Sequence, residues 1–235
     1  MRAILIADFE RDAGEVIIGG DKARHLIKVV RIKPGEKLKV LNGKGSSILC
    51  EVKTIDSKKL FLNILKVESF IREDKLDLAL GLPKTDAFED VIKSACELGL
   101  GKIIPVKMEH SQFKPIKSDR YNKLIESSLI QSNNPFFLKI DETINFIGLR
   151  DLLSSYDKIL YFCSHQDIFV KNSLEIKKRD RILMIIGPEG GLSEEEESLL
   201  NAQKNVYFIN LPSYILRTQT AVAICCGWVF AKMPN

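Results

Sequence analysis

The 235-residue chain has little of what marks several large classes of protein. It has no run of about 18 uncharged apolar residues, so the sequence offers no candidate for a membrane-spanning helix. Its start, MRAILIADFERDAG, reaches the acidic residues Asp8 and Glu10 too early for a secretory signal peptide. Its five cysteines form no CxxC pair and stand in mostly apolar strings, which favours buried reduced thiols over disulfides or zinc. We therefore expect a cytoplasmic protein without a metal site.

Several motifs of enzymes and of nucleotide-binding proteins are also missing. Neither GxxxxGK[ST] nor GxGxxG occurs, so no nucleotide-phosphate loop is indicated. GxSxG is absent, and His25, His110 and His165 lack a recognisable nucleophile partner, so a serine or cysteine hydrolase is poorly supported. The composition, 45% hydrophobic and 28% charged, is ordinary for a soluble globular chain of one or two domains.

The positive charge is concentrated near the N-terminus. Residues 1–72 contain 15 Lys and Arg against 9 Asp and Glu, a balance of +6, and the remainder contains 20 against 22, a balance of −2. A basic first part indicates an anionic partner such as nucleic acid. On charge alone, a solvated lysine surface explains the same balance equally well.

The first 72 residues have the pattern of a small β-barrel. Short β-rich runs (AILIADF, KLKVLNG, SSILCEVKTI and LFLNILKV) are separated by turn signals at Pro34-Gly35 and at NGKG, residues 42–45. One amphipathic helix is predicted over residues 21–32, with Leu26, Ile27 and Val30 on its apolar face. Its basic residues Arg24, Lys28 and Arg31 fall elsewhere on the helix, where phosphates could reach them.

From residue 75 onward, apolar strands alternate with helices. The predicted strands are 76–83, 102–106, 158–163, 181–187 and 205–211, and the predicted helices are 85–99, 121–131, 193–203 and 218–233. The first helix has a capping-box pattern at Asp86 and Glu89 and a C-terminal Gly99. Nearly continuous apolar strands alternating with helices predict a parallel sheet covered on both faces, which binds ligands at the carboxyl ends of its strands.

The stretch IGPEGGLSEEEESLL, residues 186–200, follows one of these strands. Ser193 and Glu196 form an S-x-x-E capping box, and the glutamates Glu194 to Glu197 place negative charge at the positive end of the helix dipole. A phosphate would be repelled, so the loop suits a ligand without phosphates, such as S-adenosylmethionine. A glycine turn that merely starts a helix accounts for this segment alone equally well.

The stretch LPSYILRTQTA, residues 211–221, places Arg217 at the same edge of the sheet. Thr218 or Thr220 is expected to cap the helix that follows. Because AVAICCGWVF is apolar on all sides, this helix must be buried in the core or in a subunit interface. A role for Arg217 in a site competes with simple pairing to a nearby carboxylate.

IIGPEGGLSEEE followed by ILRTQTA, with LGLPKTD, KSACELGLGKIIPV and QSNNP upstream in order, resembles the ribosomal RNA uridine-N3 methyltransferase family of the RsmE type. The resemblance covers essentially the whole chain. It implies a PUA-like β-barrel RNA-binding domain over residues 1–72 and a SPOUT methyltransferase domain over 73–235. That second domain would be an α/β fold with a parallel sheet and a C-terminal trefoil knot, and it would form a homodimer.

The resemblance also implies a reaction and its residues. The reaction is methylation by S-adenosylmethionine of N3 of a uridine in 16S ribosomal RNA of the small subunit, uridine 1498 in the usual bacterial numbering. The implied cofactor-binding residues are Cys163, Ser164, Gly187, Pro188, Glu189, Gly190, Gly191, Leu211, Pro212, Ile215 and Leu216, and the implied catalytic residues are Arg217 and Thr218. Arg2, Arg24, Lys28, Arg31 and Lys44 are candidates for phosphate contacts. His165, Glu189 and water are candidate proton acceptors by location.

The chain departs from the family pattern at three positions. The family usually has Glu where this chain has Gln219, often has Glu where it has Ser127, and often has Arg where it has Asn134. Any role for an acidic residue at 219 or an arginine at 134 is therefore in doubt. Two alternatives remain open: a SPOUT methyltransferase with another target, in transfer RNA or elsewhere in ribosomal RNA, and a noncatalytic RNA-binding or ribosome-assembly protein.

Overall fold

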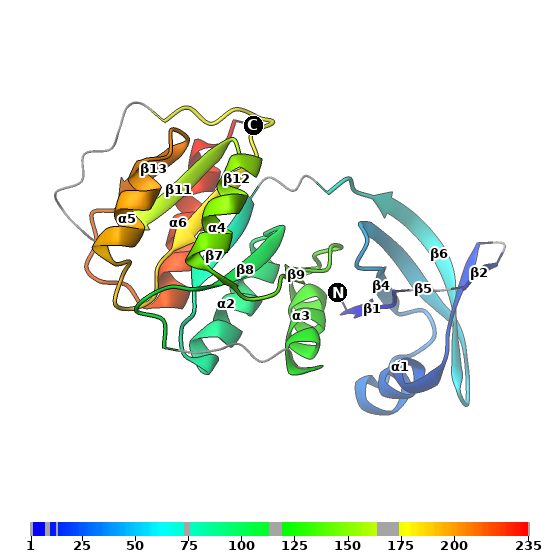
Figure 1. The fold of residues 1–235 in the computed structure, drawn as a ribbon. Helices are drawn as coiled ribbons and strands as arrows, with labels where there is room; N and C mark the ends of the chain where they lie inside the picture. The colour runs from blue at the N-terminus through cyan, green and yellow to red at the C-terminus, as the bar shows by residue number, and fades with distance from the viewer. Residues whose placement is uncertain are drawn as a thin grey trace. The chain divides into compact units, whose positions relative to one another are not determined.

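A computed structural model describes residues 2–7, 10–12 (backbone only), 14–72, 76–112, 119–163 and 174–234. The chain divides into two compact units, shown as a ribbon in Figure 1. The first unit comprises residues 1–72 together with 126–137, and the second comprises 73–125 and 138–235. The strip 126–137 thus packs with the N-terminal residues, although it lies within the second part of the sequence.

The first unit is built on a six-stranded sheet with the order β1-β4-β5-β6-β3-β2. Its strands are β1 (Arg2–Leu5), β2 (Glu10–Asp12), β3 (Glu15–Ile18), β4 (Lys37–Leu41), β5 (Ser46–Asp56) and β6 (Lys59–Ser69). Strands β1 and β4 are parallel, and the other neighbours are antiparallel. Side chains such as Val16, Leu38, Ile48 and Leu62 are fully buried between them. The runs of strand residues predicted from the sequence are confirmed, and β2 and β3 are added to them.

The helix predicted over residues 21–32 is also present, in two parts. Helix α1 (Gly20–His25) continues into the π-helical turn η1 (Leu26–Val30), which ends at Arg31 in the left-handed region with φ of 55°. Leu26 is buried in the core, and Ile27 and Val30 pack against it. Arg24, Lys28 and Arg31 are exposed, so the predicted division into an apolar and a basic side is confirmed.

The strip 126–137 is joined to the Asn42–Gly45 turn by backbone hydrogen bonds. Gly45 N donates to the Pro135 carbonyl at 2.9 Å, and Phe137 N donates to the Gly43 carbonyl at 2.8 Å. Arg72 donates to the Phe137 carbonyl at 2.9 Å and lies 5.7 Å from the Phe136 ring centre. The strip therefore completes the first unit rather than merely passing it.

The second unit contains a seven-stranded sheet whose recorded pairings are all parallel. Its strands are β7 (Leu76–Gly81), β8 (Lys102–Lys107), β9 (Lys139–Ile140), β10 (Ile144–Asn145), β11 (Lys158–Cys163), β12 (Ile182–Ile186) and β13 (Val206–Asn210). Their order is β10-β8-β7-β12-β11-β13, with β9 beside β8. Strands β7 and β12 are buried along their whole length, as their apolar runs predict.

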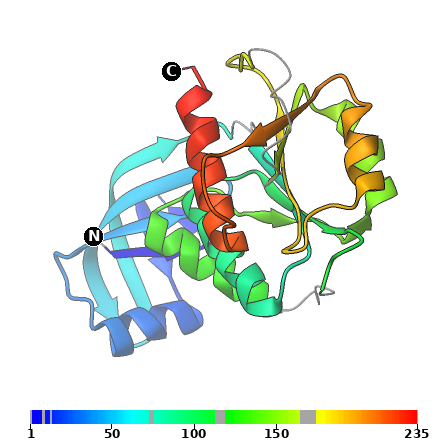
Figure 2. The same cartoon turned by 90° about the vertical axis from the view of Figure 1, so that its left-hand side faces the viewer.

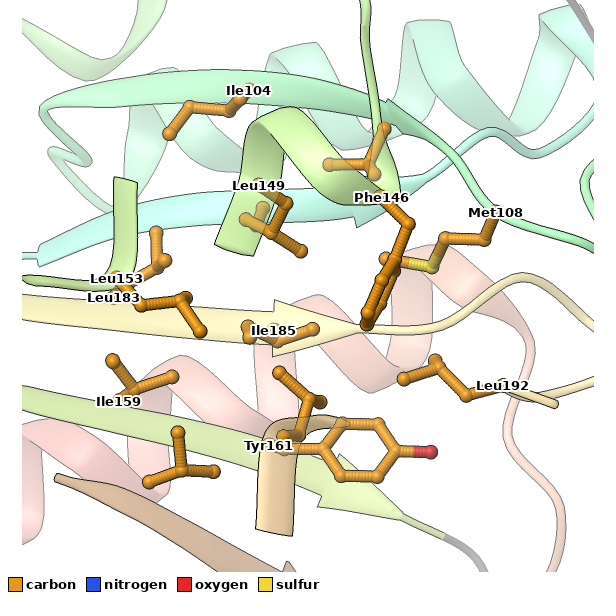
Figure 3. Close-up of a cluster of buried hydrophobic side chains, with 14 of the residues drawn as sticks. Ile104, Met108, Phe146, Leu149, Leu153, Ile159, Tyr161, Leu183, Ile185 and Leu192 are labelled. Atoms are coloured by element: carbon orange, nitrogen blue, oxygen red, sulfur yellow. The ribbon is translucent and has the colours of Figure 1, made fainter. Parts of the chain in front are cut away.

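Helices cover both faces of this sheet. They are α2 (Thr85–Glu97), α3 (Asp119–Ser132), α4 (Phe146–Leu152) with the 3₁₀ turn η2 (Leu153–Ser155), α5 (Glu194–Asn201) and α6 (Thr218–Lys232). Figure 2 shows α2 and α6 on one face and α4 and α5 on the other. On the second face, Phe146 and Leu149 of α4 pack toward Ile104, Ile159 and Ile185 of the strands (Figure 3). The predicted parallel α/β sheet is confirmed.

The capping pattern predicted for the start of α2 is wrong, whereas the one predicted for its end is confirmed. The predicted Asp86–Glu89 capping box is wrong, because the helix begins at Thr85 after Lys84, which makes no side-chain cap. Glu89 is instead buried and paired with Arg120, with Nε and Oε1 2.6 Å apart. The predicted C-terminal Gly99 is confirmed: its φ is 72°, and Leu100 N donates to the Ala95 carbonyl at 3.0 Å, as in a Schellman motif.

Three further observations concern membranes, metals and thiols. No helix in the described ranges is both long enough and apolar enough to cross a membrane. Within those same ranges, no group of three or more His, Cys, Asp and Glu side chains is placed to hold a metal ion. All five cysteines are buried and carry thiols rather than disulfides.

Candidate functional site

The loops that follow the parallel strands meet at one edge of the second unit's sheet, where such sheets bind ligands. The glycine-rich loop Gly187–Gly191 follows β12 and lies directly beside the end of β7. A Cβ on Gly81, the last residue of β7, would lie 2.4 Å from Pro188 N and 2.5 Å from its Cδ. Only a residue without a Cβ permits this approach of the two backbones.

The glycine-rich loop turns sharply into helix α5. Gly191 N donates to the Pro188 carbonyl at 2.8 Å, and Gly191 has a φ of 73°, in the left-handed region. Glu196 N then donates to Ser193 Oγ at 3.3 Å, and Ser193 N donates to Glu196 Oε2 at 3.1 Å. The predicted capping box is confirmed, so part of the helix N-terminus is already satisfied by its own side chains.

A pocket opens at this edge of the sheet. It is lined by Tyr161, Phe162, Cys163, Ile186, Gly187, Pro188, Glu189, Gly191, Leu211, Ser213, Tyr214, Ile215, Leu216, Thr218, Ala221 and Cys225. The lining is mostly apolar and backbone, with one carboxylate from Glu189. No lysine or arginine is among the described residues that line it. The site therefore favours an apolar or cationic ligand over a phosphate.

Most of the predicted cofactor-binding residues are brought together here. Cys163, Gly187, Pro188, Glu189, Gly191, Leu211, Ile215 and Leu216 all line the pocket. Gly190 and Pro212 belong to the same loops but do not line it, and Ser164 lies outside the described residues. Prediction from sequence missed lining residues such as Tyr161 and Phe162, although both lie within two positions of the predicted Cys163.

Apart from Glu189, the described residues that line the pocket carry no charged side chain. Burial raises the pKa of the Tyr161 hydroxyl, which donates to Glu197 Oε1 at 2.9 Å and so stays protonated near neutral pH. Burial likewise raises the pKa of the Cys225 thiol to about 12, so this side chain carries no charge there. Both groups offer polarizable or aromatic surface rather than charge to a ligand.

Arg217 and Thr218 stand at the start of helix α6. The expectation that Thr218 or Thr220 caps the helix is wrong, because α6 already begins at Thr218 and Arg217 takes the N-cap position without a side-chain cap. Thr218 is buried and lines the pocket, whereas Arg217 is exposed next to it. Gln219, a departure from the family pattern, follows in the first turn.

The apolar helix α6 is only half covered within one chain. Val222, Cys225, Cys226 and Val229 are buried, but 44% of Ile224 and 39% of Phe230 are exposed. Burial on all sides was predicted, and the single chain supplies it on one side only.

The candidate phosphate contacts lie in the first unit. Arg24, Lys28 and Arg31 are exposed on α1 and η1, and Lys44 is exposed on the Asn42–Gly45 turn. Arg2 pairs with Glu36, with Nη1 and Oε2 2.6 Å apart. Of the other positions discussed from the sequence, Ser127 is exposed on α3, Asn134 accepts a hydrogen bond from Phe136 N at 2.9 Å, and His165 lies outside the described residues.

Models of two known protein families each match a different part of the chain. Residues 72–230 match the RNA methyltransferase domain family, and residues 18–65 match the RNA methyltransferase PUA domain family. Because the first match spans more than half of the chain, the protein belongs to the RNA methyltransferase domain family. The expected α/β class and the N-terminal PUA-like domain are thus confirmed.

Individual relatives carry a more specific name. The chain is 27% identical over 212 residues to ribosomal RNA small subunit methyltransferase E of Rickettsia conorii, covering 88% of this chain and 86% of the relative. It is 28% identical over 219 residues to the protein of the same name in Bacillus subtilis, covering 87% and 85%. Among solved structures, ribosomal RNA small subunit methyltransferase E of Neisseria gonorrhoeae, bound to S-adenosylmethionine, shares the fold with a TM-score of 0.78 at 22% identity, covering 98% and 97%.

Proposed function

We propose that this protein uses S-adenosylmethionine to methylate N3 of a uridine in the ribosomal RNA of the small subunit. The observation that carries the proposal is the pocket at the carboxyl edge of the sheet, without lysine or arginine among its described lining residues, in a member of an RNA methyltransferase family. The names of the Rickettsia and Bacillus relatives support the small-subunit RNA as substrate. By resemblance, the target is uridine 1498 in the usual bacterial numbering.

The residues present fit S-adenosylmethionine. Apolar side chains such as Ile186, Leu211 and Leu216 suit an adenine ring, and the Glu189 carboxylate suits a positively charged group. The glycines leave backbone N–H and C=O groups within reach of a ligand, because no side chain covers them. When bound, the cofactor supplies a methyl group carried on a positively charged sulfur. We assign its binding to the predicted cofactor-binding residues that line the pocket, namely Cys163, Gly187, Pro188, Glu189, Gly191, Leu211, Ile215 and Leu216.

Arg217 is the residue that we assign to charge stabilisation. Uridine N3 becomes a good nucleophile only as it loses its proton and negative charge spreads over N3 and the two flanking carbonyl oxygens. A guanidinium fixed beside those oxygens stabilises that charge, and electrostatic stabilisation of this kind is usually the largest catalytic effect. Arg217 is exposed and adjacent to the pocket-lining Thr218, so it can reach a base presented there. Thr218 would orient the base or the arginine at the pocket.

The base must also be presented and deprotonated. N3 lies on the pairing edge of uridine, so the nucleotide has to be exposed or flipped out of a helix. Of the proton acceptors named from the sequence, Glu189 lines the pocket, which favours it by position. Water and His165, which lies outside the described residues, remain the other candidates.

The first unit would hold the RNA. Arg24 and Lys28 lie one turn apart on the α1–η1 segment, and Arg31 directly follows it. All three are exposed, so together they can contact successive phosphates. Arg2 and Lys44 add basic groups from β1 and from the Asn42–Gly45 turn. Since positive charge is concentrated in this part of the sequence, we assign it RNA binding.

We also propose a homodimer formed through helix α6, because its exposed apolar residues need a cover. The trefoil knot and the cytoplasmic location, which follow from the family resemblance and from the composition, remain predictions. Analytical ultracentrifugation would test the dimer directly. A monomer at micromolar concentration would contradict it.

The proposed reaction is tested by methyl transfer from labelled S-adenosylmethionine to small ribosomal subunits isolated from a strain that lacks the protein. Mass spectrometry of the product nucleoside should identify N3-methyluridine. Arg217→Ala should bind the cofactor normally but lose roughly 100-fold or more in rate, the scale found when one preorganised donor is removed.

Each failure of this test points to a different alternative. Cofactor binding without product on small subunits would contradict the substrate, and transfer RNA would be tested next. Failure of the folded protein to bind the cofactor would contradict the enzyme assignment and favour a noncatalytic RNA-binding protein.

A further inference from the structure

The loop that follows β8, residues 108–112, is fastened to the start of helix α5. Glu109 N donates to Glu196 Oε1 at 3.0 Å, while the other oxygen of the same carboxylate accepts from Ser193 N at 3.1 Å. Glu196 is 8% exposed, so both hydrogen bonds are partly shielded from water. The capping residue therefore joins two loops that come from different strands.

His110 makes a second connection between the same loops. Its Nδ1 lies 3.2 Å from the Gly191 carbonyl, which can only accept, so Nδ1 carries the proton. His110 also fills the space beside Gly190, because a Cβ on Gly190 would lie 2.9 Å from His110 Cβ. The 108–112 loop thus supports the glycine-rich loop at Gly190, at Gly191 and at the helix that follows.

The supporting loop has its own fixed shape. Met108 is buried, Met108 N donates to Ser111 Oγ at 2.9 Å, and Ser111 N donates to the Met108 carbonyl at 3.1 Å. A glycine-rich segment has many accessible backbone conformations, so its bound shape is costly to reach unless its neighbours restrict it. The contacts from Glu196 and His110 supply that restriction.

We infer that Glu196 and His110 are positioning residues that hold the Gly187–Gly191 loop in the shape that binds S-adenosylmethionine. Neither side chain lines the pocket, so both act through the loop rather than on the ligand. The inference rests on the proposed cofactor. It assigns Glu196 a role beyond helix capping, because capping requires only the pair with Ser193.

The first test uses three variants in the intact protein. Glu196→Ala removes the acceptor of both Ser193 N and Glu109 N, and Ser193→Ala removes only the other half of the capping box, the bond from Glu196 N to Ser193 Oγ. Glu195→Ala removes an exposed glutamate from the same helical turn as a matched control. Hydrogen exchange of the 187–193 amides is measured without ligand, and the Kd for S-adenosylmethionine is measured by calorimetry. Steady-state kinetics then separates KM from kcat.

Glu196→Ala should speed exchange of the loop and raise the Kd and the KM for the cofactor about tenfold, the scale of one lost hydrogen bond to a charged group. Its kcat at saturating cofactor should stay within about twofold, because the bound loop regains its shape. Glu195→Ala should match the wild type, and Ser193→Ala should change the Kd by less than about threefold, since it leaves the Glu109 link intact.

A second test addresses His110. His110→Ala removes the imidazole contact with the Gly191 carbonyl but keeps the Cβ beside Gly190, so it should speed exchange of the loop and raise the Kd for S-adenosylmethionine. Unchanged exchange in His110→Ala would overturn the role of His110. Unchanged loop exchange in Glu196→Ala would overturn the inference whatever the ligand. An equal loss in Ser193→Ala would also overturn it, by reducing Glu196 to a helix cap. If the wild-type protein itself failed to bind the cofactor, the proposed function would be contradicted. The exchange rates of the 187–193 amides would still show whether Glu196 restrains the loop.

Discussion

The protein contains two glycine-rich turns, one in each unit, that use the same backbone freedom for different ends. Gly43 and Gly45 in the Asn42–Gly45 turn and Gly191 in the Gly187–Gly191 loop all have positive φ, at 71°, 100° and 73°. The first turn is closed by backbone hydrogen bonds to Pro135 and Phe137 and carries the exposed Lys44. The second borders a pocket and carries the Glu189 carboxylate.

The comparison teaches that glycine content alone does not identify a ligand site. At both turns, a glycine allows backbone to approach backbone more closely than a Cβ would permit: Gly45 beside the Phe70 carbonyl, and Gly81 of β7 beside Pro188 of the second turn. What differs is the neighbourhood: only the second turn lies at the carboxyl edge of a parallel sheet, where several loops converge. The side chains beside each turn, a lysine or a glutamate, then decide which charge a partner would need.

The largest expected effect follows from placing a methyl group between β7 and the second turn. Gly81→Ala would bring a Cβ within 2.4 Å of Pro188 N, so the backbone must shift at a cost of about 3 kcal/mol. We expect cofactor binding to be lost in calorimetry and the protein to unfold at lower urea concentration. Gly99→Ala, at a positive φ with open space around it, is the control that should lower stability but keep binding. Normal binding by Gly81→Ala would show that the loop can move away freely.

The equivalent change in the first turn should leave the cofactor pocket intact. In Gly45→Ala, the Cβ would lie 2.6 Å from both Phe136 Cε1 and the Phe70 carbonyl, at a φ of 100°. We expect a loss of about 2–3 kcal/mol in unfolding free energy with an unchanged Kd for S-adenosylmethionine. Gly35→Ala, which has a φ of 84° and no atom within 4 Å of the new Cβ, isolates the cost of backbone strain. Loss of cofactor binding in Gly45→Ala would contradict the separation of the two turns.

Removing a lysine from the first unit should weaken RNA binding and leave cofactor binding unchanged. Lys28→Ala should weaken RNA binding and reduce the slope of log K against log salt by about 0.7–0.9, the effect of one phosphate contact. Lys58→Ala, which removes an exposed lysine at the β5–β6 turn, is the matched control with the same change of net charge. Equal slopes for the two variants would indicate a general charge effect rather than a contact at η1.

The smallest effect concerns two buried thiols, Cys225 beside the pocket and Cys50 in the first unit's core. Burial raises the pKa of Cys225 from 9.0 to about 12, so the thiolate that reacts with iodoacetamide is scarce at pH 8. Because the folded state then binds more protons than the unfolded state, this thiol should lower stability as pH rises above 9. Peptide mass spectrometry should show S-adenosylmethionine slowing alkylation of Cys225 and not of Cys50. Equal protection of both would argue against a ligand at this pocket.

Local patterns in the sequence predicted the regular elements well. Apolar periodicity located the strands β7, β8, β11, β12 and β13 of the parallel sheet and the helices α2, α3, α5 and α6. The S-x-x-E pattern located the start of α5. The pattern at Asp86 and Glu89 failed because Glu89 is used by Arg120, a partner from another helix. The short elements β9, β10 and α4 were not predicted, since so few residues establish no period.

The candidate site was predictable only in part, for a related reason. Motifs identified the loops after β12 and β13, but the sequence shows only the local half of the Glu196 contacts. The hydrogen bond between Glu196 and Glu109 joins residues 87 positions apart, so the S-x-x-E motif gives no sign of it. The same limit applies to the strip 126–137, whose bonds to Gly43 and Gly45 depend on tertiary packing.

The strip 126–137 affects when the first unit can finish folding during synthesis. The N-terminal 72 residues leave the ribosome long before Pro135 and Phe137, which supply partners to Gly45 and Gly43. The first unit therefore cannot reach its final hydrogen bonding until part of the following unit's sequence has been synthesised. A gene truncated after Arg72 would encode a fragment that lacks residues 126–137 of the first unit. The boundary of the folded unit and the boundary of the sequence segment are not the same.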